Sequence, residues 1–196
     1  AECSSERDFE PRTGEEHYIL YTGGTTGYPK GVVWTHDDLF HKPLSGGNPY
    51  GDAHPDLEAI ATAAEAMPPI SFLIAAPLMH GAASYAMFFY FIFGGRLVML
   101  RDFDPARIVD GIADEGLQSL LIVGDAMGQP LADEMERRRD EVDYSGLFMI
   151  ASGGAIWSQA CRERFRELAP GAMQRDNFGA SESGNDGEIS LDDQGN

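Results

Sequence analysis

The sequence predicts an α/β domain with a mostly parallel sheet flanked by helices. Short apolar runs that fit buried strands alternate with longer segments that fit helices along most of the 196 residues. Glycine- and proline-rich loops separate them, and Ser, Thr or Asp stands where several helices would begin. The hydrophobic content of 43% and the charged content of 23% are typical of a globular chain. We therefore expect one domain over residues 1–196.

The first half of the chain supplies a strand, a helix and a loop excursion. A strand is expected at 17–23, where an apolar run ends in a glycine loop. Thr35 is expected to begin a helix, with Asp38 three residues later as in a weaker capping box. Residues 42–69 are rich in Gly, Pro and Ala and predict a surface excursion. A buried strand, a core helix and a further strand are expected at 71–76, 82–93 and 96–100.

The second half continues the alternation. Asp104 and Pro105 begin a helix that Gly116 ends. Ser158 is expected to cap another helix, which ends before Pro170. The remaining expected elements are strands at 117–123, 147–153 and 173–178, a solvated helix at 130–142, a helix at 159–168, a loop at 179–184 and the start of a hairpin without a partner at 188–196. These last residues suggest a piece of a longer protein.

Residues 71–95 also raise the question of a membrane span. They contain no Asp, Glu, Lys or Arg, and the segment is long enough to cross a bilayer. Pro77, Gly81, Gly94 and Gly95 divide it into three shorter pieces, so we favour strand, helix and strand.

Charge and cysteine content exclude several classes of function. The formal net charge is −18, from 14 Lys and Arg against 32 Asp and Glu, and this argues against binding nucleic acid. Cys3 and Cys161 cannot form a disulfide framework and lack the spacing of metal ligands. Residues 1–16 are polar and lack the apolar core of a signal peptide. We expect a soluble, cytoplasmic protein.

The most informative run is TGGTTGYPKG at residues 22–31. Glycines permit close backbone approach, so consecutive N–H groups can converge on an anion. Thr25 and Thr26 add hydroxyl groups, and Lys30 adds a positive charge in an otherwise acidic chain. The run is not a Walker A loop, because Tyr28 and Pro29 separate Gly27 from Lys30. A simple strand-to-helix turn is the alternative, but the combination favours a polyphosphate site.

This loop resembles the signature of the adenylate-forming enzymes, which include acyl-CoA synthetases, luciferases and peptide-synthetase adenylation domains. Three further runs match in the family's order: APLMHGAA at 76–83, ASGGAI at 151–156 and DNFGASESG at 176–184. The sequence around the first loop is most similar to that of bacterial acyl-CoA synthetases for fatty or sterol-side-chain acids. The resemblance covers nearly the whole chain and implies part of the large domain of such an enzyme.

The resemblance also implies roles for individual residues. His80 would lie beside the carboxylate and the acyl tunnel, and Glu182 would hold Mg²⁺, with Thr26 as a further metal ligand. Phe178 would stack on the adenine, and Ser181 would reach the α-phosphate. Thr26, Lys30, His80 and Glu182 are thus the expected catalytic residues. The expected nucleotide-binding residues are Thr22, Gly23, Gly24, Thr25, Thr26, Gly27 and Lys30 at the β- and γ-phosphates, Gly154 and Ala155 beside the adenine, and Asp176, Asn177, Phe178, Gly179, Ala180 and Ser181 in the last motif.

Two substitutions distinguish the last motif from the family pattern. Phe178 stands where many relatives have Tyr, and it keeps the stacking face but loses a hydroxyl. Ser181 stands where Thr is usual, and it keeps the hydroxyl. The family's ribose-binding Asp, its hinge and its C-terminal lysine domain have no counterpart in the sequence.

The implied reaction joins a carboxylic acid to ATP as an acyl-adenylate and then to CoA as a thioester. ATP, Mg²⁺ and CoA are the expected cofactors and co-substrates, and a fatty or sterol-derived acid is the expected substrate. Loading of a carrier protein, nucleotide binding without turnover and an inert structural core are alternatives, and homo-oligomer formation is left open. His80 alone also fits a core histidine, Glu182 an ordinary loop carboxylate, and Asp125 either an acyl-pocket residue or the start of a helix.

Overall fold

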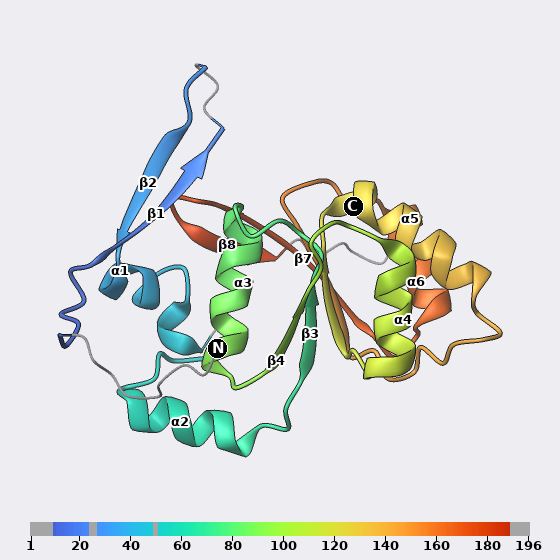
Figure 1. The fold of residues 1–196 in the computed structure, drawn as a ribbon, viewed down its shortest axis with the longest axis horizontal. Coiled ribbons are helices and arrows are strands. Elements are labelled where there is room, and N and C mark those ends of the chain that lie inside the picture. Colours follow the sequence, from blue (N-terminus) through green and yellow to red (C-terminus); the bar gives the residue numbers. More distant parts are fainter. Residues whose placement is uncertain (1–9, 24–26, 49–50, 189–196) are drawn as a thin grey trace, which may run out of the picture.

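The structure is a computed structural model that describes residues 10–23, 27–48 and 51–188. Its centre is a six-stranded sheet in the order β4-β3-β5-β6-β7-β8 (Figure 1). The first five strands of this order are parallel, and β8 pairs antiparallel with β7 at one edge. The strands are β3 (Ser71–Ile74), β4 (Arg96–Met99), β5 (Ser119–Ile122), β6 (Met149–Gly153), β7 (Met173–Ala180) and β8 (Gly184–Glu188). The predicted α/β class with a mostly parallel sheet is confirmed.

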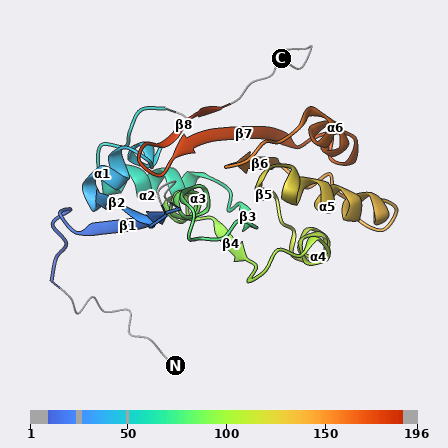
Figure 2. The same cartoon turned by 90° about the horizontal axis from the view of Figure 1, so that it is seen from above.

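Three helices cover one face of this sheet, namely α4 (Pro105–Glu115), α5 (Gly124–Arg137) and α6 (Gln159–Leu168) (Figures 1 and 2). Their apolar side chains form the largest core cluster with the strands. Ile108, Ile150 and Phe165 are completely buried in it. Burial of a large apolar side chain contributes about 1.5–3 kcal/mol, so this layer fixes the sheet.

The opposite face is covered by α3 (Gly81–Ile92), which packs on β3 and β6. Phe72 on β3 stacks on Tyr90 of α3 with ring centroids 3.6 Å apart. The far side of α3 supports a separate antiparallel hairpin, β1 (His17–Thr22) and β2 (Lys30–Thr35), together with α1 (His36–His41). Strands β1 and β2 project beyond the sheet, and the end of the ladder at Thr22 and Lys30 lies away from the body (Figure 1).

Several helix caps predicted from sequence are confirmed. Thr35 accepts a hydrogen bond from the backbone N–H of Asp38 at 3.0 Å, and Asp104 accepts from Ala106 at 3.0 Å. Ser158 caps α6 through the N–H of Cys161 at 3.2 Å. Gly116 ends α4 with φ of 63°, a left-handed conformation that favours glycine. Cys161 is buried, as expected for a packing residue, whereas Cys3 lies outside the described residues.

Other sequence predictions are corrected. Residues 30–35 form β2 instead of a loop leading to the helix, and the excursion at 42–69 contains η1 (Ser45–Gly47) and α2 (Leu57–Ala66). The helix predicted at 130–142 spans 124–137, and its inner face is fully buried rather than solvated. The predicted loop at 179–184 is the end of β7 and a turn into β8, which pairs with β7. The hairpin start predicted at 188–196 falls almost entirely outside the described residues. No helix in the described part of the chain is long and apolar enough to cross a bilayer.

Candidate nucleotide site

Three of the four sequence motifs meet at the carboxyl edge of the sheet. The segment 76–83 follows β3 and begins α3, the segment 151–156 ends β6, and 176–184 ends β7 and turns into β8. In parallel α/β sheets this edge is where ligands bind, because loops and helix N-termini converge there. The first motif lies at the far end of the β1–β2 hairpin, and the other end of this hairpin packs on α3 through Leu20 and Trp34.

The motif after β6 lies directly against the other two. Gly153 pairs with Asn177 in the β6–β7 ladder. A methyl group on Gly153 would lie 3.2 Å from the carbonyl oxygen of Asn177 and 3.9 Å from Cβ of Ala82. The backbone of β6 therefore approaches both β7 and the first turn of α3. This contact brings three segments that are distant in sequence within a few ångströms.

The base of the hairpin joins the same cluster. A methyl group on Gly81 would lie 3.3 Å from Cδ2 of Leu20, on β1, and 3.5 Å from Oγ of Ser181. The predicted α-phosphate ligand Ser181 therefore lies beside the residue that follows His80. The sequence indicates that these two motifs lie together only through the family resemblance.

A hydrogen-bonded group of three residues, Trp34, Tyr85 and Ser181, links the hairpin, α3 and the β7–β8 turn. The indole N–H of Trp34 is shared between the carbonyl oxygen of Ser181 at 3.0 Å and the phenolic oxygen of Tyr85 at 3.1 Å. The Tyr85 hydroxyl donates to the same Ser181 carbonyl at 2.8 Å. Trp34 and Tyr85 are buried, at 7% and 6% exposed. Burial is the largest influence on Tyr85 and raises its pKa, so the phenol keeps the proton that it donates.

The side chains expected to touch substrate remain accessible. His80, Gly154, Ala155 and Glu182 are exposed. Phe178 is 50% exposed and packs over Gly187, since a methyl group there would lie 2.9 Å from its Cε1 atom. Asn177 and Ser181 are half-buried, and Gly179 and Ala180 are exposed. The ring of Phe178 is thus supported by β8 while part of its surface is open to a ligand.

Asp176 differs from its neighbours in the motif. Its carboxylate is buried and forms an ion pair with Arg162 of α6. Arg162 also donates to the carbonyl of Trp157 at 3.2 Å and lies 4.9 Å above the Trp157 ring. Asp176 therefore anchors β7 to α6, and a direct contact with the adenine stays a prediction. The sequence gives no signal of this pair.

The tip of the hairpin extends away from the cluster. Thr22 pairs with Lys30 at the loop end of the ladder, where Lys30, Gly23 and Gly27 are exposed. Trp34 stands four positions after Lys30, or about 13 Å along β2. Gly24, Thr25 and Thr26 fall outside the described residues, so their predicted roles stay predictions.

Comparison with known proteins places the chain in a family. The model of the AMP-binding enzyme family matches residues 4–192. The chain belongs to the AMP-binding enzyme family. It is 39% identical over 186 residues to a medium/long-chain-fatty-acid–CoA/3-oxocholest-4-en-26-oate–CoA ligase of Mycolicibacterium smegmatis, covering 92% of this chain and 34% of the relative. A 3-oxocholest-4-en-26-oate–CoA ligase of Rhodococcus rhodochrous is 37% identical, with 94% and 34% covered. The chain thus spans about a third of the length of these curated relatives.

Solved structures agree on the fold. The luciferase-like enzyme of the mealworm Zophobas morio superposes with a TM-score of 0.72 at 18% identity, covering 99% of this chain and 42% of that one. The O-succinylbenzoate coenzyme A synthetase of Bacillus subtilis, in complex with AMP, gives a TM-score of 0.64 at 21% identity, with 92% and 33% covered. The chain has the fold of part of the large domain of AMP-binding enzymes.

The loop that follows β6 and contains the end of the motif at 151–156 is fixed by contacts that the sequence did not predict. The Ser152 hydroxyl accepts a hydrogen bond from the N–H of Gly124 at 3.0 Å. Asp125 Oδ1 accepts from the N–H of Ser158 at 2.8 Å, and its own N–H donates to Ile156 at 2.9 Å. Asp125 therefore begins α5 and also positions the loop. Its alternative role in an acyl pocket stays untested.

The pKa of Asp125 gives a prediction on stability. Burial acts to raise this pKa, but the hydrogen bonds from Ser158 and neighbouring side chains outweigh burial and hold it below the ordinary value. A lowered pKa in the folded state stabilises the fold above the unfolded value, about 3.9, and this contribution disappears as the pH falls through the folded pKa. Asp125→Asn should therefore be less stable than the wild type from pH 5 to 7, by roughly the same amount throughout.

Urea denaturation of both proteins from pH 7 to pH 2.5 checks this prediction. The difference between the two free energies of unfolding should shrink as the pH falls below about 4. Other carboxylates titrate in both proteins and cancel in the difference. A difference that stays constant down to pH 2.5 would show that the charge of Asp125 does not stabilise the loop.

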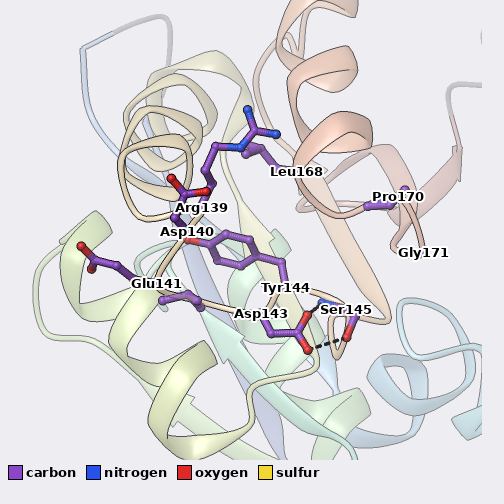
Figure 3. A pocket seen from close by; sticks show the side chains of 10 residues that line it. Arg139, Asp140, Glu141, Asp143, Tyr144, Ser145, Leu168, Pro170 and Gly171 are labelled. Carbon is purple, nitrogen blue, oxygen red and sulfur yellow. Dashed lines mark hydrogen bonds between the residues drawn. The ribbon is translucent and has the colours of Figure 1, made fainter.

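A hollow of about 630 Å³ lies elsewhere in the molecule (Figure 3). It is formed by the segment that leads into β6 and by the turn that leads into β7, at the amino ends of these strands. Asp143 accepts hydrogen bonds there from the N–H and hydroxyl of Ser145, at 2.9 and 3.0 Å, which lower its pKa. The lining residues are Arg139, Asp140, Glu141, Val142, Asp143, Tyr144, Ser145, Leu168, Pro170 and Gly171. The family motifs lie at the opposite, carboxyl edge, so we place the candidate site there.

Proposed function

We propose that the chain is the nucleotide-binding part of a carboxylate–CoA ligase. The observation that supports this most is the meeting of His80–Gly81, Gly153 and Ser181 at one edge of the sheet, in a chain 37–39% identical to fatty-acid and steroid-acid CoA ligases. By analogy with these relatives, the acid is a medium- or long-chain fatty acid or a steroid side-chain acid.

In this proposal the nucleotide lies along the carboxyl edge of the sheet. The adenine rests between the backbone of Gly154 and Ala155 and the exposed face of Phe178. Ser181 reaches the α-phosphate, and the hairpin residues Thr22–Lys30 hold the β- and γ-phosphates. A solved structure of similar fold, the O-succinylbenzoate coenzyme A synthetase, is a complex with AMP, in keeping with a fold that binds an adenylate. About 13 Å of β2 between Trp34 and Lys30 gives room for a triphosphate to extend toward the hairpin tip.

The first reaction step needs positioning and charge neutralisation more than proton transfer. The substrate carboxylate, already ionised at neutral pH, attacks the α-phosphorus. A new carboxylate O–P bond forms, and the P–O bond to the β-phosphate breaks, so pyrophosphate leaves with the electron pair. Two anions meet in this step, and the hydrogen-bond donors and the Lys30 charge lower its barrier. No protein side chain has to act as a general base.

The residues present suit a magnesium ion held together with the phosphates. Mg²⁺ is commonly bound through one or two carboxylates, with phosphate and water oxygens completing its shell. Glu182 is exposed, follows Ser181 directly and is close enough to Tyr85 to influence its pKa. The ion would supply positive charge next to the phosphates.

His80 stands at the start of α3, between the nucleotide edge and the helix face. Its side chain does not cap α3 and is exposed. We assign it to the substrate carboxylate and the entrance of the acyl site. Transfer to CoA would need parts of the relatives that this chain does not span.

Pyrophosphate exchange tests the proposal directly. The full-length protein in which this sequence lies should incorporate labelled pyrophosphate into ATP when supplied with fatty or steroid acids, and product analysis with CoA should find the thioester. Exchange without any acid would instead indicate another nucleotide reaction. Absence of exchange across the panel of acids would contradict the proposal, and a thioester formed only on a carrier protein would favour the carrier-loading alternative.

A further inference from the structure

Trp34 and Tyr85 lie outside the family motifs. Their side chains nevertheless form a hydrogen-bonded contact that joins three elements of the candidate site. Both donate to one acceptor, the carbonyl oxygen of Ser181, at 3.0 and 2.8 Å. They come from different elements, β2 and α3, and lie 147 and 96 residues from Ser181 in sequence. Through hydrogen bonds to this one carbonyl, the β1–β2 hairpin and α3 are both joined to the β7–β8 turn.

Contacts on both sides of the β7–β8 turn fix its position, and the Ser181 carbonyl is one of them. Gly184 follows the turn with φ of 90°, and a methyl group there would lie 2.6 Å from Cα of Pro43. Ser183 donates to the carbonyl of Ala180 at 3.2 Å and, through its hydroxyl, to Asp186 at 2.6 Å. Pro43 bounds the turn from the segment after α1, and Trp34 and Tyr85 hold it at Ser181. Glu182, between these contacts, is exposed.

We propose that Trp34 and Tyr85 are positioning residues that orient Ser181 and Glu182 toward the nucleotide and couple this turn to the phosphate-binding hairpin. The proposal rests on the proposed function, because Ser181 and Glu182 act there at the α-phosphate and the metal. Trp34 lies on the same strand as Lys30, so its indole N–H connects the strand that carries Lys30 to the Ser181 carbonyl. Neither residue touches substrate.

The shared acceptor predicts a specific pattern in a double-mutant cycle. Trp34→Phe and Tyr85→Phe each leave one donor on the carbonyl, whereas the double variant leaves none. In the full-length protein, each single variant should lower kcat of acid-dependent pyrophosphate exchange a few-fold. The double variant should lower kcat by at least about tenfold more than the product of the single losses. KM for Mg-ATP should change less than about threefold, because orientation at the reacting phosphate matters most in the transition state.

Tyr144→Phe is the matched control. Tyr144 is also a buried tyrosine whose hydroxyl donates to a carbonyl, that of Met135 at 3.0 Å, but it lies in the core on the other side of the sheet. Its replacement should leave kcat and KM unchanged. Single and double losses that simply multiply, a loss confined to KM or no loss at all would overturn the proposal.

Trp34 also offers a readout that does not depend on the double variant folding. Trp34 and Trp157 are the tryptophans of these 196 residues, so a full-length background in which Trp157 and every tryptophan outside this chain are replaced by Phe isolates the emission of Trp34. Mg-ATP should shift this emission, and Tyr85→Phe should reduce the shift. An emission that ignores Mg-ATP in a protein active in exchange overturns the coupling. A wild type with neither exchange nor Mg-ATP binding contradicts the proposed function itself.

Discussion

Replacing Lys30 by alanine is expected to lower acid-dependent pyrophosphate exchange by about 100- to 1,000-fold, the usual effect of removing one preorganised charge-stabilising donor. Lys30 is exposed at the start of β2, opposite Thr22 in the hairpin ladder. In a chain of net charge −18, a triphosphate needs local positive charge to approach. The effect should appear mainly in kcat/KM for Mg-ATP, with the protein as stable as the wild type.

Lys42→Ala is the control for this variant, because Lys30 and Lys42 are the lysines of the sequence. Lys42 lies at the end of α1 and pairs with Asp38 at 2.8 Å on the surface. Its removal changes the net charge equally but should alter exchange by less than about twofold, since exposed pairs contribute little. Equal losses in both variants would mean that overall charge, rather than the loop, controls nucleotide binding.

Arg162→Met should destabilise the chain by about 3–5 kcal/mol, because it removes one member of a buried ion pair. The Arg162 and Asp176 side chains are 7% and 6% exposed. The Asp176 carboxylate would keep its burial but lose the guanidinium that compensates its charge. Urea denaturation of the 196-residue chain at pH 7 measures the effect. Because Asp176 precedes Asn177 and Phe178 on β7, we also expect weaker nucleotide binding.

Two further variants separate the buried charge from arginine packing. Arg137→Met removes a surface arginine, 64% exposed, that pairs with Glu134 at 2.6 Å, and it should cost no more than about 1 kcal/mol. The double variant Arg162→Met with Asp176→Leu should regain most of the lost stability, since it replaces both charges by apolar groups. A double variant less stable than Arg162→Met would contradict the ion-pair explanation.

Local signals in the sequence predicted the alternating core of the fold well. Thr35, Asp104 and Ser158 each place a side-chain oxygen next to free N–H groups of the same helix, so the capping information lies within a few residues. The strands β3, β5 and β6 are mostly apolar because helices cover both faces of the parallel sheet. Their signal therefore also lies within a few residues.

Elements whose support is distant in sequence were missed. In β2, Val33 is 54% exposed and Trp34 is buried, and this difference arises from packing on α3, some fifty residues away. The helix α2 has no buried residue, and half of its residues are alanines, which counted toward the predicted surface excursion. Its neighbours, rich in Gly and Pro, favoured a loop instead.

In the candidate site, too, the parts with a local sequence signal were predicted and the parts that depend on distant contacts were not. The motifs and their order identified the segments that meet at the sheet edge, and the family match over residues 4–192 confirms the resemblance. The side chains that orient these segments carry no local signature. The contacts of Trp34 and Tyr85 with Ser181, and of Arg162 with Asp176, span 14 to 147 residues of sequence, so local sequence patterns could not reveal them.

Calorimetric titration of the full-length protein with Mg-ATP and with AMP tests most directly whether the hairpin and the β7–β8 region hold one nucleotide. Phe178→Ala should weaken both ligands by about tenfold or more, because it removes the ring that supports the base. Lys30→Ala should weaken Mg-ATP by about tenfold or more and leave AMP unchanged, since AMP lacks the β- and γ-phosphates. Mg-ATP binding that either substitution leaves intact, or AMP binding that Lys30→Ala weakens equally, would contradict the account.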